Sequence, residues 1–230
     1  MRAIFLEDLN FQGEIQVTGD ACHHLSQVVR LTQGEEVLVL DGRGKKIKCL
    51  AELISKKLIV LKVIKEELIE RSFQLDLVLG IPKREALELS LKQATELGFR
   101  KIFLIRSDYS QTKIPEIDRL KSLLINAMEQ SNNPFLPEII ETQWQRVPWD
   151  QYQYVTMLDS QSNEHKKAIQ SLSGENLLIV GPEGGFSPGE LEFLRNRPNV
   201  TSLHLPTFIL RTPTAVAAGA GYILRALMNR

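Results

Sequence analysis

NLLIVGPEGGFSPGELEFL, residues 176–194, is the stretch of sequence that decides the fold. Its first five residues form a short apolar run rich in Leu, Ile and Val, which is typical of a buried strand. The next five, GPEGG, include three glycines that permit tight turns and a close backbone approach that a Cβ atom would block. A helix is then predicted to begin with Ser187 as N-cap, Pro188 in its first position and Glu190 completing an S-x-x-E capping box.

A second stretch of the same kind, LHLPTFILRTPTAVAAGAGYIL, covers residues 203–224. Leu203–Leu205 is predicted to be another short strand, 206–211 a loop, and Thr212-Pro213 the N-cap and first-turn proline of a helix that continues to Leu227. A strand, a tight loop and a helix N-terminus are how α/β proteins build small-ligand sites, because backbone N–H groups point into the loop. The glycine spacing is not that of a dinucleotide fingerprint or a P-loop. From the residues alone, a ligand loop and a plain, well-capped scaffold remain equally supported.

The composition is that of a globular protein, with 43% hydrophobic and 24% charged residues in a chain of 230. The formal net charge is zero, so nucleic-acid binding would require a local basic patch. Cys22 and Cys49 lack metal-ligand spacing and are expected to be buried, reduced thiols. Glu7 and Asp8 stand where a signal peptide would be apolar, and no uncharged apolar stretch has the length of a membrane span. We therefore expect a cytoplasmic protein with no membrane partner and no metal.

Residues 1–71 are predicted to form a small β domain. VLVLDGRGKKIKCLAELI, 37–54, contains two strand-like runs around a hairpin turn, and KKLIVLKVIKEEL, 56–68, adds a third, as in a barrel-like domain. Between residues 43 and 65, eight cations accompany one acid, Glu52, and could follow a phosphate backbone. Alternatively, each of these cations simply lies on a solvated strand face and binds nothing. The cations are Arg43, Lys45, Lys46, Lys48, Lys56, Lys57, Lys62 and Lys65.

Two further segments complete this part of the chain. ACHHLSQVVRL, 21–31, is predicted to be a short helix with Leu25 on its apolar face and Arg30 pointing outward. Its histidines have no partner at metal-ligand spacing, so packing is the simplest role for His24. The charged segment from Glu66 to Arg71 is interpreted as a linker to a second domain, 72–230.

Residues 72–230 alternate strands and helices. FQLDLVLGI, 73–81, and KIFLIRS, 101–107, are predicted strands on either side of an amphipathic helix, ALELSLKQATELG, which indicates a parallel α/β sheet. Lys83 and Arg84 follow the first strand, where such sheets place their ligands, and phosphate contact or a solvated helix start would each explain them.

Another predicted helix ends at Asn132-Asn133-Pro134, and Glu129 in its last turn is unfavourable against the helix dipole, which indicates a functional constraint. Trp144 and Trp149 are interpreted as core anchors. A strand, 154–160, and a helix, 165–173, lead to the paired loops. The small residues of the last helix favour either tight packing within the domain or a dimer interface.

Five blocks of this chain, in order, resemble the RsmE family of bacterial methyltransferases, which belong to the SPOUT superfamily and act on small-subunit ribosomal RNA. They are HHLSQVVRL (23–31), PKREALELSLKQATELG (82–98), AMEQSNN (127–133), GPEGGFS (181–187) and LPTFILRTPTA (205–215). The resemblance implies a PUA-like RNA-binding β domain followed by a trefoil-knotted α/β methyltransferase domain that binds S-adenosylmethionine. It also implies a homodimer whose partner is small-subunit ribosomal RNA or the assembled small subunit.

The resemblance also assigns roles to individual residues. Arg211 would lie near the transferred methyl group and stabilise negative charge on the pyrimidine, and a backbone-capping role is compatible with this. Cofactor contacts are implied for Leu158, Gly181, Pro182, Gly185, Leu203, Leu205, Leu210, Thr212 and Ala215. Together with the local arguments above, it points to RNA contacts at His24, Arg30, Lys45, Lys46, Lys48, Lys83, Arg84 and Glu129.

This sequence leaves the family pattern at several polar positions. Pro213 replaces a glutamate, Tyr109 and Asn133 replace arginines, and Gln93 replaces a lysine. Pro213 suits a helix start, so these changes bear on substrate choice or activity and not on the fold. The favoured function is methylation of N3 of a uridine in small-subunit ribosomal RNA. The alternative is a non-catalytic RNA- or ribosome-binding relative, or a methyltransferase with another RNA substrate.

Overall fold

The computed structural model describes residues 1–7, 9, 11–110, 112–160 and 173–228. It divides into two compact units, each described by itself below. The first unit contains Met1–Arg71 and Ile125–Leu136, and the second contains Ser72–Leu124 and Pro137–Arg230.

The first unit is built on a five-stranded sheet with strand order β1-β3-β4-β5-β2. β1 pairs with β3 in parallel, and the other pairs are antiparallel. Cys22 and Cys49 are free and buried in its apolar core, as predicted, and burial raises the pKa of Cys49 to about 12. The elements are β1 (Arg2–Phe5), β2 (Glu14–Val17), α1 (Gly19–His23), η1 (His24–Val28), β3 (Glu36–Leu40), β4 (Lys45–Ile54) and β5 (Ile59–Leu68).

Two local predictions in this unit are corrected. Glu66 and Glu67 do not begin a linker but continue β5, because cross-strand pairing with β4 extends to Leu68. The helix predicted over 21–31 is α1 followed by a single π-helical turn, η1, which ends before Arg30 takes a left-handed backbone with φ 53°. Leu25 is buried as expected and Arg30 is exposed.

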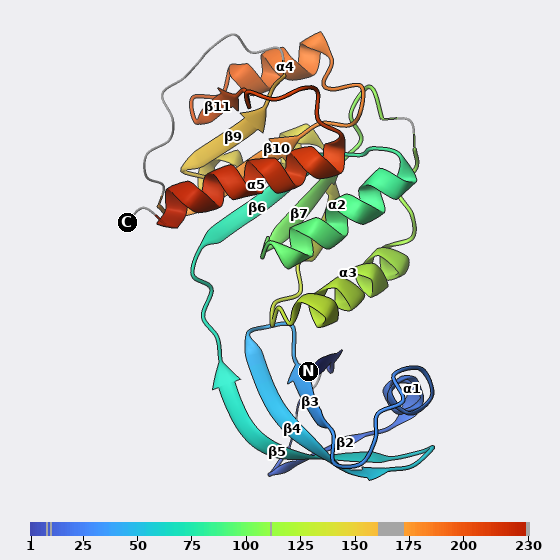
Figure 1. Ribbon diagram of the computed structural model, residues 1–230. Helices are drawn as coiled ribbons and strands as arrows, with labels where there is room; N and C mark the ends of the chain where they lie inside the picture. Colours follow the sequence, from blue (N-terminus) through green and yellow to red (C-terminus); the bar gives the residue numbers. More distant parts are fainter. Residues whose placement is uncertain (8, 10, 111, 161–172, 229–230) are drawn as a thin grey trace. The chain divides into compact units, whose positions relative to one another are not determined.

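The second unit is an α/β fold with a six-stranded parallel sheet of order β11-β9-β10-β6-β7-β8, which confirms the predicted fold class. In Figure 1, α2 and α5 lie side by side, and they contact each other. The strands are β6 (Gln74–Gly80), β7 (Lys101–Ile105), β8 (Glu138–Thr142), β9 (Tyr154–Leu158), β10 (Glu175–Val180) and β11 (Val200–Leu203). The helices are α2 (Arg84–Glu96), α3 (Ile117–Ser131), α4 (Pro188–Arg195) and α5 (Thr212–Met228), with 3-10 turns η2 (Trp144–Arg146) and η3 (Trp149–Gln151). The division between the two units falls within α3.

The capping box predicted for α4 is present: Ser187 Oγ accepts the N–H of Glu190, and the Glu190 carboxylate accepts the N–H of Ser187. The strand predicted over Leu203–Leu205 is wrong in its bounds. β11 begins at Val200 and ends at Leu203, because its parallel pairing with β9 ends where Leu203 meets Leu158. The helix predicted over 165–173 falls almost entirely within 161–172, outside the described residues.

The N-cap assignment of Thr212 is also wrong. Thr212 is already helical, and the carbonyl of Arg211 accepts the N–H of Ala215, so Arg211 occupies the capping position. The Thr212 hydroxyl is engaged elsewhere and donates to the carbonyl of Gly181 at 3.1 Å. This bond joins the beginning of α5 to the loop that follows β10.

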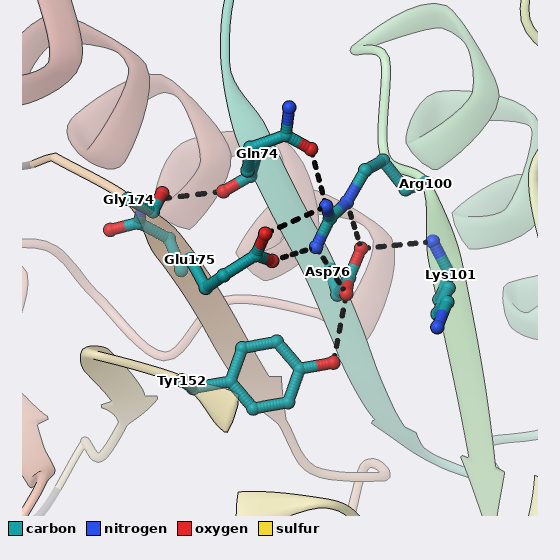
Figure 2. A network of polar contacts seen from close by, with 8 residues as sticks. Gln74, Asp76, Arg100, Lys101, Tyr152, Gly174 and Glu175 are labelled. Atoms are coloured by element: carbon teal, nitrogen blue, oxygen red, sulfur yellow. Dashed lines mark hydrogen bonds and ion pairs between the residues drawn. The ribbon is translucent and has the colours of Figure 1, made fainter. Parts of the chain in front are cut away.

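A partly buried polar network lies at the amino-terminal edge of the parallel sheet (Figure 2). Asp76, 1% exposed, accepts hydrogen bonds from the Arg100 guanidinium and the Tyr152 hydroxyl, and Arg100 also pairs with Glu175. Burial works to lower the pKa of Arg100, but the two carboxylates outweigh it and hold that pKa above its usual value. Burial and the Asp76 charge raise the pKa of Tyr152. The network joins β6, β7 and β10 at the edge opposite their carboxyl ends, and we assign it to stability.

Candidate active site

A cavity of about 360 Å³ lies at the carboxyl ends of three adjacent strands. Leu158, Val180 and Leu203, the last residues of β9, β10 and β11, all line it. This edge of a parallel sheet is where α/β proteins bind ligands, and the volume falls in the range of small-molecule sites, roughly 300–1,000 Å³. All nine residues that the sequence assigned to a cofactor lie in its wall: Leu158, Gly181, Pro182, Gly185, Leu203, Leu205, Leu210, Thr212 and Ala215.

The loop after β10 follows a path that requires glycine. A Cβ atom on Gly80, at the end of β6, would lie 2.6 Å from Cδ of Pro182, so only glycine lets this loop cross the sheet edge. Gly185 has φ 71°, and its N–H donates to the carbonyl of Pro182 at 2.9 Å, closing a turn. The sequence did not single out Gly80, because its close contact is with Pro182, which is far away in the chain.

Glu190 accepts the hydrogen bonds that fix the end of this loop. It is 7% exposed, and its carboxylate accepts hydrogen bonds from Ser187 N (2.8 Å), Ser107 Oγ (2.9 Å), Trp144 Nε1 (2.9 Å) and Asp108 N (3.3 Å). The Ser187 hydroxyl also donates to Asp108. One carboxylate thus holds the end of the GPEGGFS loop to η2 and to the segment after β7. The capping box predicted only the bonds between Glu190 and Ser187. It did not predict those from Ser107, Asp108 and Trp144.

Two charged residues predicted to contact RNA lie beside the same loop. The backbone N–H of Lys83 donates to both carboxylate oxygens of Glu183, at 3.2 Å each. The guanidinium of Arg84 donates to Glu88 one turn later along α2, at 3.2 Å. Both side chains are exposed. The Lys83 charge is open to an anion, whereas the Arg84 charge is shared with Glu88 in an exposed ion pair, which is a weak interaction.

Arg211 stands between two residues of the cavity wall, Leu210 and Thr212. It is exposed, and its side chain makes no hydrogen bond or ion pair within the part of the chain that the structure describes. The preceding residues, Phe208 and Ile209, line the cavity with 95% and 89% of their surface exposed. Arg211 itself is not among the wall residues, and its unpaired guanidinium is free to interact with an anionic group.

The remaining predicted RNA contacts lie in the first unit. His24 and Arg30 are exposed. Glu129 accepts the backbone N–H of Phe5 at 2.8 Å, and burial raises the pKa of Glu129, while that hydrogen bond and the His24 charge oppose the rise. Glu129 therefore holds the end of α3 to β1, a structural contact that a residue-by-residue assignment could not show.

The basic cluster of this unit is more neutral than its sequence indicated. Four of the eight cations are paired with glutamates, three of which lie outside the counted window. Strand pairing brings three of the pairs together, because β4 lies between β3 and β5 in the sheet, whereas Lys65 and Glu67 lie two residues apart on β5 itself. The pairs are Lys45–Glu66, Lys48–Glu36, Lys62–Glu52 and Lys65–Glu67.

Within the described ranges, no three His, Cys, Asp or Glu side chains gather as a metal site would require. None of the helices in that part of the chain combines the length and apolar character that a membrane crossing needs.

Comparison with known proteins identifies the family. A family model described as an RNA methyltransferase domain matches residues 70–224, and one described as an RNA methyltransferase PUA domain matches residues 17–64. A ribosomal RNA small subunit methyltransferase E from Rickettsia conorii is 32% identical over 203 residues, covering 84% of this chain and 82% of its own length. The chain belongs to the RsmE family of RNA methyltransferases.

Other known proteins resemble this chain in sequence or in fold. The Bacillus subtilis relative, also named ribosomal RNA small subunit methyltransferase E, is 28% identical over 218 residues, covering 86% of this chain and 85% of its own. The crystal structure of such an enzyme from Neisseria gonorrhoeae, bound to S-adenosyl methionine, superposes with a TM-score of 0.87 at 21% identity over 99% of this chain and 98% of that one. A Legionella pneumophila structure, also with that cofactor, has a TM-score of 0.83 at 22% identity over 97% of each chain. These two likenesses concern the fold.

Proposed function

We propose that this RsmE-family protein transfers a methyl group from S-adenosylmethionine to N3 of a uridine in small-subunit ribosomal RNA. The observation that carries the proposal is the cavity at the ends of β9, β10 and β11, whose wall contains both loop motifs in a chain with full-length relatives named for this RNA. We also propose that the two loops that line the cavity form the trefoil knot expected for this family.

The residues of the cavity suit this cofactor. Leucine side chains from three elements line it and would enclose the adenine, and the turn at Gly181–Gly185 presents backbone groups to polar atoms. A Cβ on Gly181 would come within 3.3–3.4 Å of the Phe186 ring, a tight contact that the ring could relieve only by shifting. When bound, the cofactor supplies an activated methyl group on a sulfonium. The leucines are Leu158 on β9, Leu191 on α4, Leu203 on β11, and Leu205 and Leu210 in the segment after β11.

The protein has to orient the acceptor and stabilise the charge that forms on it. Removing the proton from N3 leaves negative charge on the pyrimidine ring, and the free guanidinium of Arg211, which lies in the chain between two wall residues, is placed to stabilise it. Excluding water from the cavity would strengthen this interaction.

The RNA would be held mainly through phosphate contacts. Lys83 and Arg84 are exposed beside the cavity loop, and Lys45, Lys46, Lys48, His24 and Arg30 would contribute from the first unit. We further propose that the protein acts in the cytoplasm as a homodimer. The partner would bind the exposed face of α5 that carries small residues, including Thr214 and Gly221. Light scattering should then show twice the mass of one chain, which is 26.1 kDa.

The test begins with calorimetric titration of S-adenosylmethionine, followed by labelled-methyl transfer to deproteinised small-subunit RNA and to small subunits. Arg211→Ala should leave cofactor affinity within about twofold and lower transfer ~100-fold, as the loss of a charge-stabilising group does. Arg146→Ala, at an exposed arginine in η2 that is absent from the cavity wall, is the matched control. Absence of cofactor binding at millimolar concentration would reject the enzyme and leave an RNA-binding relative. Unchanged transfer by the Arg211 variant would remove that residue from the mechanism.

A further inference from the structure

Two large apolar side chains of the cavity wall are exposed to solvent. Phe208 and Ile209 follow β11 within the segment that leads to Arg211, and both line the cavity although almost all of their surface is exposed. Phe208, at 95%, is more exposed than any other large hydrophobic residue in the described part of the chain. Scattered exposed hydrophobic residues are common, but an exposed aromatic ring in the wall of a binding cavity indicates a contact surface.

The segment is held so that Phe208 stays outside the core. The N–H of Thr207 donates to the carbonyl of Leu205 at 2.7 Å, and the Thr207 hydroxyl donates to the carbonyl of Phe208 at 3.0 Å. Elsewhere in this unit, the ring of Trp144 packs against Phe186 and Phe193, with centroids 5.5 and 6.4 Å away. Phe208 has no part in that cluster among the described contacts, so packing does not explain it.

A second exposed ring lies beside another wall residue. Tyr109 is 46% exposed, and its side chain lies so close to Gly184 that a Cβ there would come within 3.0 Å of it. The cavity therefore has an exposed aromatic residue in its wall and another packed on its loop, and Arg211, with a free guanidinium, lies in the chain between two wall residues. Aromatic rings combined with a cation are how proteins hold unpaired bases of single-stranded RNA.

The chemistry of the proposed acceptor requires such a surface. N3 of a uracil lies on the edge that pairs with adenine, so the base must be unpaired and turned out of its stack before a methyl group can reach it. Enzymes that act on an extruded base replace the lost stacking with apolar or aromatic side chains. We propose that Phe208 is the residue on which the acceptor base stacks at the cavity mouth. This inference rests on the proposed function and makes Phe208 a positioning residue.

The alternative occupant of this surface is a second copy of the chain. Continuity with the cavity favours RNA, since Thr207, Phe208 and Ile209 are wall residues and a partner covering all three would close the route by which a base reaches the cofactor. The experiment separates these two occupants.

The test compares Phe208→Ala and Phe208→Trp with Leu89→Ala, which shortens a half-exposed leucine on α2 that is absent from the cavity wall. Phe208→Ala should keep the affinity for S-adenosylmethionine within about twofold and lower kcat/KM for small-subunit RNA by about 10- to 100-fold, the effect of losing one base–aromatic stack. Phe208→Trp should retain transfer within a few-fold, and its indole emission should be quenched when the purified RNA binds. Both native tryptophans are buried, so the parent protein supplies the background.

Three results would overturn the proposal: unchanged kcat/KM in Phe208→Ala, an equal loss in Leu89→Ala, or no quenching in a Phe208→Trp protein that binds the RNA. A shift from dimer to monomer in Phe208→Ala, with RNA affinity unchanged, would assign Phe208 to the second copy instead. Quenching does not depend on methyl transfer. If the parent protein fails to methylate while Phe208→Trp is quenched, the proposed reaction fails and the stacking contact stands.

Discussion

Replacing Glu190 with alanine should destabilise the α/β unit far more than its place in a short surface helix suggests. The substitution leaves four donors without their acceptor: the N–H groups of Ser187 and Asp108, the Ser107 hydroxyl and the Trp144 indole. Ser107, Ser187 and Trp144 are themselves buried. An unsatisfied buried donor costs about 1–3 kcal/mol, and a lost helix cap about 1 kcal/mol. Water entering the vacated space would satisfy some of them, so we expect a loss of roughly 3–5 kcal/mol.

Tryptophan fluorescence is a suitable probe, because both tryptophans of the chain lie in this unit and one of them donates to Glu190. Denaturant unfolding would be followed for the parent, Glu190→Ala and Glu192→Ala. Glu192 is exposed on the same helix, and its substitution should change the free energy of unfolding by less than about 0.5 kcal/mol.

The same change should weaken cofactor binding, since Glu190 holds the end of the GPEGGFS loop. Calorimetry on the folded variant should show reduced affinity for S-adenosylmethionine, while Glu192→Ala binds as the parent does. If the two variants unfold within about 0.5 kcal/mol of each other, the four hydrogen bonds do not form the centre inferred from the structure.

Three further predictions test other parts of the molecule. Gly189→Ala, on α4, should stabilise the protein by up to about 1 kcal/mol, because the only atom near the added methyl is Ser187 Oγ at 4.0 Å. Gly219→Ala should destabilise it by about 1–2 kcal/mol, because its methyl would meet Leu158 and Leu178 at 3.0 Å; equal thermal midpoints would contradict this. The pKa of Glu129 is raised in the folded protein, so its contribution to stability is complete below its unfolded pKa of about 4.3 and is lost as the pH rises through the folded value. Glu129→Gln keeps an acceptor for the Phe5 N–H, and circular dichroism should show it gaining stability relative to the parent as the pH rises above the unfolded pKa. The exposed Glu14→Gln should show no such gain. The triple change Lys45, Lys46 and Lys48 to Ala should weaken RNA binding and reduce the salt slope by about 0.7–0.9 for each phosphate that the protein no longer neutralises, and an unaltered slope would return these lysines to a solvated strand face.

The sequence by itself determined the elements whose signals are local. Apolar runs bounded by glycine or proline indicated the strands, and Ser187-Pro188 with Glu190 fixed the start of α4, because a cap and its partners lie within one helical turn. It also singled out the two loops that line the cavity, since a strand, a glycine turn and a helix start are each recognisable over a few residues. Element ends were less accurate: Leu203 closes β11 because a neighbouring strand ends there.

Only the tertiary structure decided which distant groups meet. Glu190 accepts hydrogen bonds from Trp144 and Ser107, which are 46 and 83 residues away in the chain. The Thr212 hydroxyl, expected to cap α5, donates instead to the carbonyl of Gly181. The glutamates that neutralise half of the basic cluster come mostly from outside the window in which the charges were counted. The segment Ile125–Leu136 joins the first unit although it follows part of the second in the chain. The reason is physical: capping, turns and periodicity act between neighbours in the chain, whereas these pairings depend on strand register and side-chain packing, which are set only when the whole chain has folded.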